Sequence, residues 1–161
     1  MNYLIIRGPL GCGKSTISKV LAKKLGAEYI SVDKILEENN LDNDWEEGYI
    51  SQKSFLEANR IIEKLAKESL AKNNLVIIDG NFYWKSQILD LEKRLGEVTV
   101  FTLKAPLEVC IKRDSLRKEK HGEKAAREVY KKVNEFDFGE IIDITKPVEK
   151  CVKEIYLSFT S

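Results

Sequence analysis

Residues 8–15, which read Gly-Pro-Leu-Gly-Cys-Gly-Lys-Ser, constrain this chain more than any other segment. They match the pattern GxxxxGK[ST] at every fixed position, between an apolar run at 3–6 and an amphipathic stretch at 14–25. Glycines let the backbone curl so that successive N–H groups point at one anion, and the N-terminus of the following helix adds its positive end. The segment therefore predicts a strand, a phosphate-binding loop and a helix, rather than an ordinary glycine turn before a helix.

The side chains of this loop have distinct expected roles. Lys14 supplies a flexible positive charge for the β- and γ-phosphates of a nucleotide, and the Ser15 hydroxyl is offered to Mg²⁺. Thr16 lies one residue too far along to take that metal position. We interpret Cys12 as a small tolerated side chain rather than a redox sensor, although a helix N-terminus can lower the pKa of a thiol. The residues expected to contact the nucleotide are Gly8, Gly11, Cys12, Gly13, Lys14, Ser15 and Thr16.

Short β-branched runs alternate with longer helical periods along the rest of the chain, and this alternation implies parallel strands. Strands are expected at 3–6, 28–32, 75–79, 98–103 and 141–144. Helices are expected at 14–25, from a capping-box spacing of Ser54 and Glu57 to 73, around 86–95, after Pro106, over 112–135 with a break at Gly122, and after Pro147. We predict one α/β domain over 1–161, a three-layer α/β/α sandwich whose five-stranded parallel sheet has the order 2-3-1-4-5.

Two aspartates end predicted strands. Asp79 follows the apolar run 75–78 and is expected to hold Mg²⁺, directly or through a water. Asp33 ends the second strand, and ligands of an open α/β sheet bind at the carboxyl ends of its strands. Both acids should therefore face one crevice. The alternative for each, and most of all for Asp33, is that it caps the N-terminus of a helix.

With these features the chain resembles the small P-loop kinases that phosphorylate metabolites, nucleotides or nucleic-acid ends. In adenylylsulfate, shikimate and polynucleotide 5′-hydroxyl kinases an Asp after the second strand meets the acceptor hydroxyl, and Asp33 matches that place. Residues 105–114 resemble a stretch of adenylylsulfate kinases, but 115–118 depart from it, which leaves the substrate open. The resemblance implies ATP and Mg²⁺ as cofactors.

The resemblance also implies an Arg-x-x-x-Arg lid, and Arg113 with Arg117 fits that spacing. Residues i and i+4 share one face of a helix, so both guanidiniums could close over a polyphosphate and neutralise charge during transfer. We expect the lid at about 113–135, with Arg127 a weaker candidate. Residues 112–132 carry nine basic and four acidic side chains, and the alternative interpretation is a solvated charged face.

The acceptor is expected to bind in a helical region at about 34–73. Arg60 could hold an anionic group of the acceptor, and Phe82 could stack on a ring. Phe82 could equally be a core residue, as we expect of Phe55. Residues 37–47 contain six acids and no base, which would repel a long phosphate backbone.

The formal net charge of +1 argues against a protein that coats nucleic acid through bulk charge. Three dispersed cysteines and one histidine make a zinc site improbable. Apolar runs too short for a membrane span, and the lack of a signal-peptide layout, indicate a cytoplasmic protein. The leading hypothesis is an ATP-dependent phosphotransferase acting on the hydroxyl of a small metabolite, nucleotide or nucleic-acid 5′ end. A nucleoside monophosphate kinase and a nucleotide-dependent regulatory ATPase remain the alternatives.

Overall fold

Five parallel strands form the central sheet of the protein. The structure is a computed structural model that describes residues 2–117 and 121–161. The strands are β1 (Tyr3–Arg7), β2 (Glu28–Ser31), β5 (Val76–Gly80), β6 (Thr99–Lys104) and β7 (Glu140–Asp143). Their order is β2-β5-β1-β6-β7, and every pairing is parallel. Counted along the chain this is the order 2-3-1-4-5, so the predicted fold is confirmed.

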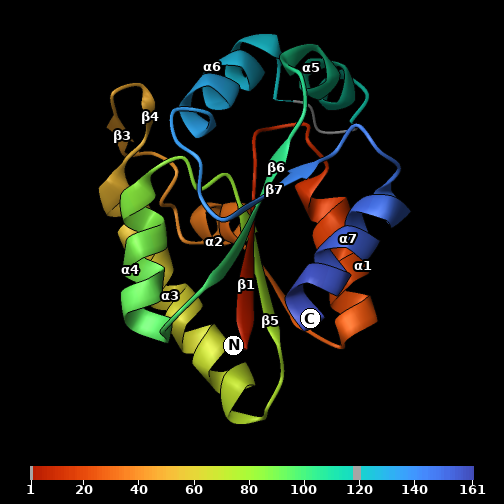
Figure 1. Ribbon diagram of the computed structural model, residues 1–161. Coiled ribbons are helices and arrows are strands. Elements are labelled where there is room, and N and C mark those ends of the chain that lie inside the picture. Colours follow the sequence, from red (N-terminus) through yellow and green to blue (C-terminus); the bar gives the residue numbers. More distant parts are fainter. Residues whose placement is uncertain (1, 118–120) are drawn as a thin grey trace.

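Helices cover both faces of the sheet (Figure 1). They are α1 (Lys14–Leu25), α2 (Val32–Glu38), α3 (Gln52–Ala71), α4 (Lys85–Leu95), α5 (Leu107–Ser115), α6 (Glu123–Val133) and α7 (Val148–Thr160). The central strands β1 and β5 are buried at every position, as expected of strands covered on both sides. Alternate residues of β1 divide between two cores: Ile5 packs in the core that holds Phe55 of α3, and Leu4 in the core that holds Ile17 of α1.

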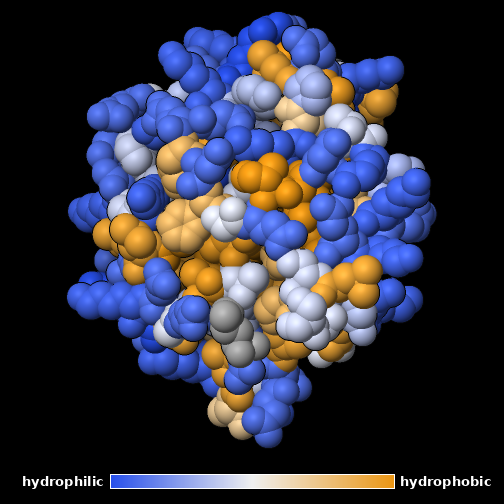
Figure 2. Space-filling view, viewed as in Figure 1, coloured by the Kyte–Doolittle hydropathy of each residue, from blue (hydrophilic) through white to orange (hydrophobic). Residues whose placement is uncertain are grey.

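The helices α5 and α6 lie beyond the carboxyl ends of the strands, at the opposite end of the molecule from the N-terminus (Figure 1). They overlap the segment 113–135 where a lid is expected, and residues 118–120 of that segment lie outside the described part of the chain. Figure 2 shows hydrophilic side chains over most of the visible face, with hydrophobic side chains gathered towards its middle. Within the described residues, no helix is both long and apolar enough to cross a membrane.

Two predicted boundaries shift. Strand β2 ends at Ser31 rather than at Val32, because the Ser31 hydroxyl accepts a hydrogen bond from the Lys34 amide and so starts α2. Asp33 therefore lies in the first turn of a helix instead of ending a strand. Ser51 is the N-cap of helix α3, and its hydroxyl accepts a hydrogen bond from the Ser54 amide. Ser54 therefore lies inside the helix, and the predicted capping box at Ser54 is wrong.

A short antiparallel hairpin that the sequence analysis did not predict lies in the region 34–73. It pairs β3 (Trp45–Glu46) with β4 (Tyr49–Ile50). Its two turn residues, Glu47 and Gly48, have φ values of 55° and 84°, the positive values that a tight two-residue hairpin turn requires. The usual signal for such a turn is Asn-Gly or Asp-Gly, and a glutamate at the first position hides it.

Candidate active site

The loop between β1 and α1 has the geometry of an anion cradle. Gly13 precedes α1 with φ 87°, and within the described residues no side chain caps this end of the helix. The first amides of α1 are therefore left for a ligand, as at other phosphate-binding helix termini. Gly11, with φ 74°, lies so close to α5 that a Cβ there would come within 2.2 Å of the Cys110 carbonyl oxygen. A side chain at this position would push the loop and α5 apart.

Lys14 and Cys12 are both buried within this loop. The Lys14 Nζ donates a hydrogen bond of 2.8 Å to the Pro9 carbonyl, which holds the ammonium group across the loop. Cys12 is fully buried in the core, and burial raises the pKa of its thiol against the lowering effect of Lys14. A thiol in that state is a poor redox sensor. The interpretation of Cys12 as a small structural residue fits this geometry.

Asp79 lies at the end of β5, where its carboxyl is 2% exposed. Burial raises its pKa, while the hydrogen bond from Tyr29 and the charge of Lys14 act to lower it. Asp79 and the Ser15 hydroxyl line one cavity with the loop. These hard oxygen donors fit Mg²⁺, which keeps several waters and takes few protein ligands.

The cavity over the loop has a volume of about 340 Å³ and brings most of the predicted site residues together. Arg113 and Arg117 line it together with the loop. Arg113 is held by a hydrogen bond of 2.9 Å from Nη2 to the Ile144 carbonyl, after β7. The residues predicted to contact nucleotide or metal that line this cavity are Gly11, Cys12, Gly13, Lys14, Ser15, Thr16, Asp79, Arg113 and Arg117. Gly8 is not among its lining residues.

A second cavity of about 370 Å³ lies beside the first. The hairpin contributes Trp45 and Tyr49 to its wall, and the segment after β5 contributes Asn81 and Tyr83. The lid contributes His121 and Glu128. Asp33 lines both cavities and stands where they meet.

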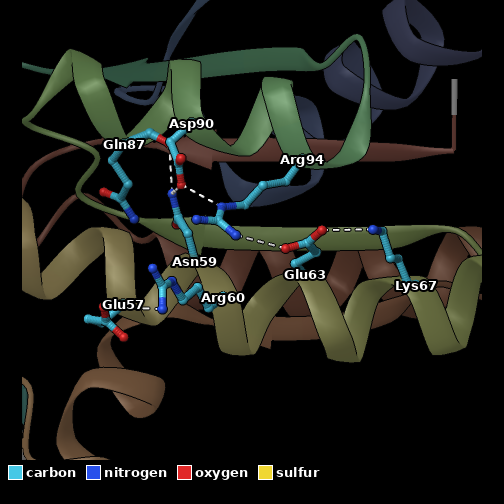
Figure 3. Close-up of polar contacts among 8 residues, drawn as sticks. All are labelled: Glu57, Asn59, Arg60, Glu63, Lys67, Gln87, Asp90 and Arg94. Carbon is cyan, nitrogen blue, oxygen red and sulfur yellow. Dashed lines mark hydrogen bonds and ion pairs between the residues drawn. The ribbon is translucent and has the colours of Figure 1, made fainter.

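Two residues predicted to bind the acceptor do not line either cavity. Phe82 is fully buried in the core and has a backbone φ of 46°. Arg60 is exposed on α3, with Nη1 3.7 Å from Oε1 of Glu57. Figure 3 shows it beside Glu57 and apart from the bonded network between α3 and α4. That network comprises Asn59, Glu63, Lys67, Asp90 and Arg94.

The contacts of three residues were not predicted from the sequence. Tyr29 was assigned only to a strand, yet its hydroxyl donates to Asp79. Tyr49 enters the second cavity through the unpredicted hairpin, together with Trp45, which lies in the region 34–73 expected to bind the acceptor. Arg7 is fully buried and donates hydrogen bonds to the carbonyls of Phe82, Val133 and Phe136. A single aromatic residue within a strand, or an arginine at the end of a strand, is too common in sequences to indicate a functional residue.

Comparison with known proteins identifies the family. The family model AAA_18, an AAA domain, matches residues 4–135. The chain is 36% identical over 94 residues to shikimate kinase of Francisella tularensis subsp. novicida (strain U112), a match over 58% of this chain and 49% of the relative. It is 30% identical over 112 residues to shikimate kinase of Legionella pneumophila (strain Corby), over 67% of this chain and 60% of the relative. The chain thus spans about half the length of the first of these relatives.

Solved structures share the fold at low sequence identity. A sugar kinase from Janibacter sp. HTCC2649 superposes with a TM-score of 0.82 and 17% identity, over 98% of this chain and 93% of that one. A gluconokinase from Sinorhizobium meliloti 1021 gives 0.74 and 16%, over 99% and 97%. Shikimate kinase from Aquifex aeolicus gives 0.69 and 20%, over 98% and 96%. The chain belongs to the AAA_18 family and has the fold of the P-loop kinases that act on small metabolites.

Proposed function

We propose that the protein is an ATP- and Mg²⁺-dependent phosphotransferase that moves the γ-phosphate of ATP to a hydroxyl of a small molecule. The observation that carries the proposal is the position of Asp33, on the wall of both cavities. The first cavity has the features of a nucleotide site, and the second is a separate space beside it. An acceptor bound in the second cavity could place its attacking hydroxyl next to the Asp33 carboxylate, at the junction with the nucleotide cavity.

In the proposed reaction the acceptor oxygen attacks the γ-phosphorus and forms a new P–O bond. The bond from the γ-phosphorus to the bridging β,γ-oxygen breaks, and its electron pair leaves with ADP. Asp33 accepts the proton of the hydroxyl or orients its oxygen. Lys14 binds the β- and γ-phosphates, and Arg113 with Arg117 stabilises the charge on the transferring group.

Ser15 and Asp79 are the residues that would hold Mg²⁺. Held there, the ion would supply positive charge that offsets the charge developing on the phosphate groups. The buried carboxyl of Asp79 is positioned by Tyr29, so one strand supplies the ligand and its neighbour orients it. We extend the proposal to a lid at 113–135, of which Arg113 and Arg117 line the nucleotide cavity.

The second cavity disfavours the main alternative. A nucleoside monophosphate kinase binds a phosphate as its acceptor, and phosphate is recognised by arginine and lysine. Among the described residues, none of those that line the second cavity is a lysine or an arginine. The carboxylates that line it also disfavour a nucleic-acid 5′ end. The names of the relatives, shikimate kinase and gluconokinase, denote kinases of small hydroxylated molecules and support the proposed reaction class.

The test is ADP release from ATP and Mg²⁺ in the presence of hydroxylated small molecules. We expect at least one to accelerate release, and Asp33→Asn to lower that turnover by about 100-fold or more while ATP still binds. Asp137→Asn, an exposed carboxylate paired with Lys104 outside both cavities, is the matched control. A regulatory ATPase would instead release ADP at a rate that no small molecule changes. Retained turnover in Asp33→Asn would indicate an acceptor that needs no base.

A further inference from the structure

The second cavity has an unusual balance of charge. Four carboxylates line it: Asp33, Glu37, Asp42 and Glu128. No lysine or arginine of the described chain lines it, and its one histidine, His121, has Nδ1 3.0 Å from Oδ1 of Asp114. The side chains that line the cavity therefore carry a net negative charge, and Lys132, which does not line it, has its Nζ 5.5 Å from the centroid of the Tyr49 ring.

The acids of this cavity differ from their neighbours on the same helices. On α2, Glu38 forms an ion pair with Lys34, and on α6, Glu123 pairs with Arg127. Neither Glu37 nor Glu128 forms an ion pair with any side chain in the ranges 2–117 and 121–161, and the same holds for the other two cavity acids. Glu38 and Glu123, which do not line the cavity, are thus each balanced by a neighbouring cation, while the four acids that line it are not.

Aromatic side chains complete the wall. Trp45 is 63% exposed on the hairpin, an uncommon state for a tryptophan in a folded chain. Tyr49 and Tyr83 also line the cavity, with their ring centroids 5.4 Å apart. Rings beside carboxylates attract organic cations, because the negative face of a ring and the carboxylate charge act together.

Asn81 supplies an independent indication of a ligand. It lines the cavity, is 9% exposed, and its Oδ1 has no hydrogen-bond partner among the described residues. Buried amide groups in folded proteins are almost always hydrogen-bonded, so an unpaired one calls for an explanation. A ligand that brings an N–H or O–H donor into the cavity could form the missing hydrogen bond to Asn81 Oδ1 after a small shift of the amide.

Building on the proposed function, we propose that the phosphate acceptor is a cation: a small polyhydroxylated molecule that also carries a protonated amine, of the amino-sugar or aminocyclitol class. Its hydroxyl stands at Asp33, and its ammonium group lies among Glu37, Asp42 and Glu128 against the aromatic wall. The proton of the hydroxyl passes to Asp33, and the amine takes no part in bond formation. Shikimate and gluconate, after which the relatives are named, carry a carboxylate that this cavity would repel.

The test compares acceptors that differ in charge but not in size. One set is D-glucosamine, D-glucose and D-gluconate, and a cyclic set is 2-deoxystreptamine, myo-inositol and quinate. ADP release is measured with each at equal concentration. We expect an amine of these sets to accelerate release at least about tenfold more than its neutral and carboxylate counterparts.

The outcomes separate this inference from the proposed function. Acceleration by a carboxylate, or equal acceleration by a neutral counterpart, overturns the cationic acceptor and leaves phosphotransfer in place. A flat response across both sets, from protein shown to bind ATP, overturns both.

Two neighbouring glutamates give a matched pair of variants for the active amine. Glu37→Gln, on the cavity wall, should raise the KM for the amine about fivefold and leave the KM for ATP unchanged. Glu38→Gln, outside this cavity, should change neither. Added salt should raise the KM for the amine in the unaltered protein more than in Glu37→Gln. An effect of Glu37→Gln on ATP alone would contradict the inference.

Discussion

The Tyr29 hydroxyl donates a hydrogen bond of 2.5 Å to Oδ2 of Asp79. The two residues lie on adjacent parallel strands, and the bond spans from β2 to the carboxyl end of β5. Burial raises the pKa of Tyr29, and its hydrogen bond to Asp79 raises it further, so the phenol stays protonated as a donor. A proposed metal ligand is thereby fixed in orientation by a residue that does not itself line the cavity over the loop.

Tyr29→Phe should weaken Mg²⁺ binding without abolishing turnover. Residues that orient a metal ligand through a hydrogen bond typically contribute about 10- to 100-fold in metal affinity. We expect the Mg²⁺ concentration for half-maximal ADP release to rise about tenfold, and the free energy of unfolding to fall by about 1 kcal/mol. Tyr156→Phe, which removes a hydroxyl on α7 beside Lys24, is the control. An unchanged Mg²⁺ dependence in Tyr29→Phe would show that the hydrogen bond serves stability alone.

Arg7→Met should destabilise the fold. The Arg7 guanidinium is fully buried, donates to three main-chain carbonyls and to Thr102, and lies 4.2 Å from the centroid of the Phe136 ring. Burial lowers its pKa to about 10, so it remains charged at neutral pH. Methionine has a similar length but leaves those carbonyls unpaired, which costs about 1–3 kcal/mol for each buried group that water cannot reach.

We expect a total loss of about 3 kcal/mol in the free energy of unfolding, measured by urea denaturation at pH 7. Arg60→Met, an exposed arginine on α3, should change it by less than about 0.5 kcal/mol. Equal midpoints for the two variants would mean that the carbonyls around Arg7 find other donors.

The sequence predicted the parts of this protein that depend on local pattern. The loop at 8–15 and helix α1 follow from a motif with fixed spacing, and the strand order matches that expected for the fold. Phe82 was open to two interpretations, and its complete burial among core residues decides for the core. Arg60 was assigned to the acceptor site from its position in the chain. In the structure its neighbour Asn59 is the residue that forms hydrogen bonds with α4, and Arg60 is exposed.

The second cavity could not be predicted because its wall comes from segments far apart in the chain. The hairpin contributes Trp45 to this wall, and helix α6 contributes Glu128. A hydrogen bond of 3.0 Å from the Tyr49 hydroxyl to the Glu128 carbonyl joins the hairpin to α6. The acidic stretch 37–47 was recognised as a repellent of phosphate. Only the structure divides it into acids that line the cavity, such as Glu37 and Asp42, and acids that do not.

Arg117→Ala should lower turnover far more than the affinity for ATP. Arg117 lines the nucleotide cavity, and a donor that acts on the transferring group contributes mainly to the transition state. We expect kcat to fall at least about tenfold with a small change in the KM for ATP. Arg127→Ala is the matched control, because Arg127 is paired with Glu123 on the exposed face of α6. If both variants lose the same activity, the charge of the lid as a whole matters and not the position of Arg117.

Asp114→Asn should loosen the lid and remove a pH-dependent part of the stability. The Asp114 carboxyl accepts hydrogen bonds from the His121 and Gly122 amides, 3.2 Å each from Oδ2, and so joins the end of α5 to the start of α6. Burial alone would raise the pKa of Asp114, but the hydrogen bonds from His121 and Gly122 outweigh it and hold the pKa below its usual value.

Because the folded state binds this proton less tightly than the unfolded chain does, the stabilisation is fully present above the ordinary aspartate pKa of about 4 and disappears as the pH falls through the lower folded value. Asp114→Asn should therefore be less stable than the unaltered protein by about 2 kcal/mol at pH 7, and the difference should shrink towards zero below the folded pKa. Urea denaturation across this pH range measures it, with Glu97→Gln, an exposed carboxylate before β6, as the control. A difference that stays constant down to the lowest pH would mean that the amide is disfavoured by its shape rather than by the lost charge.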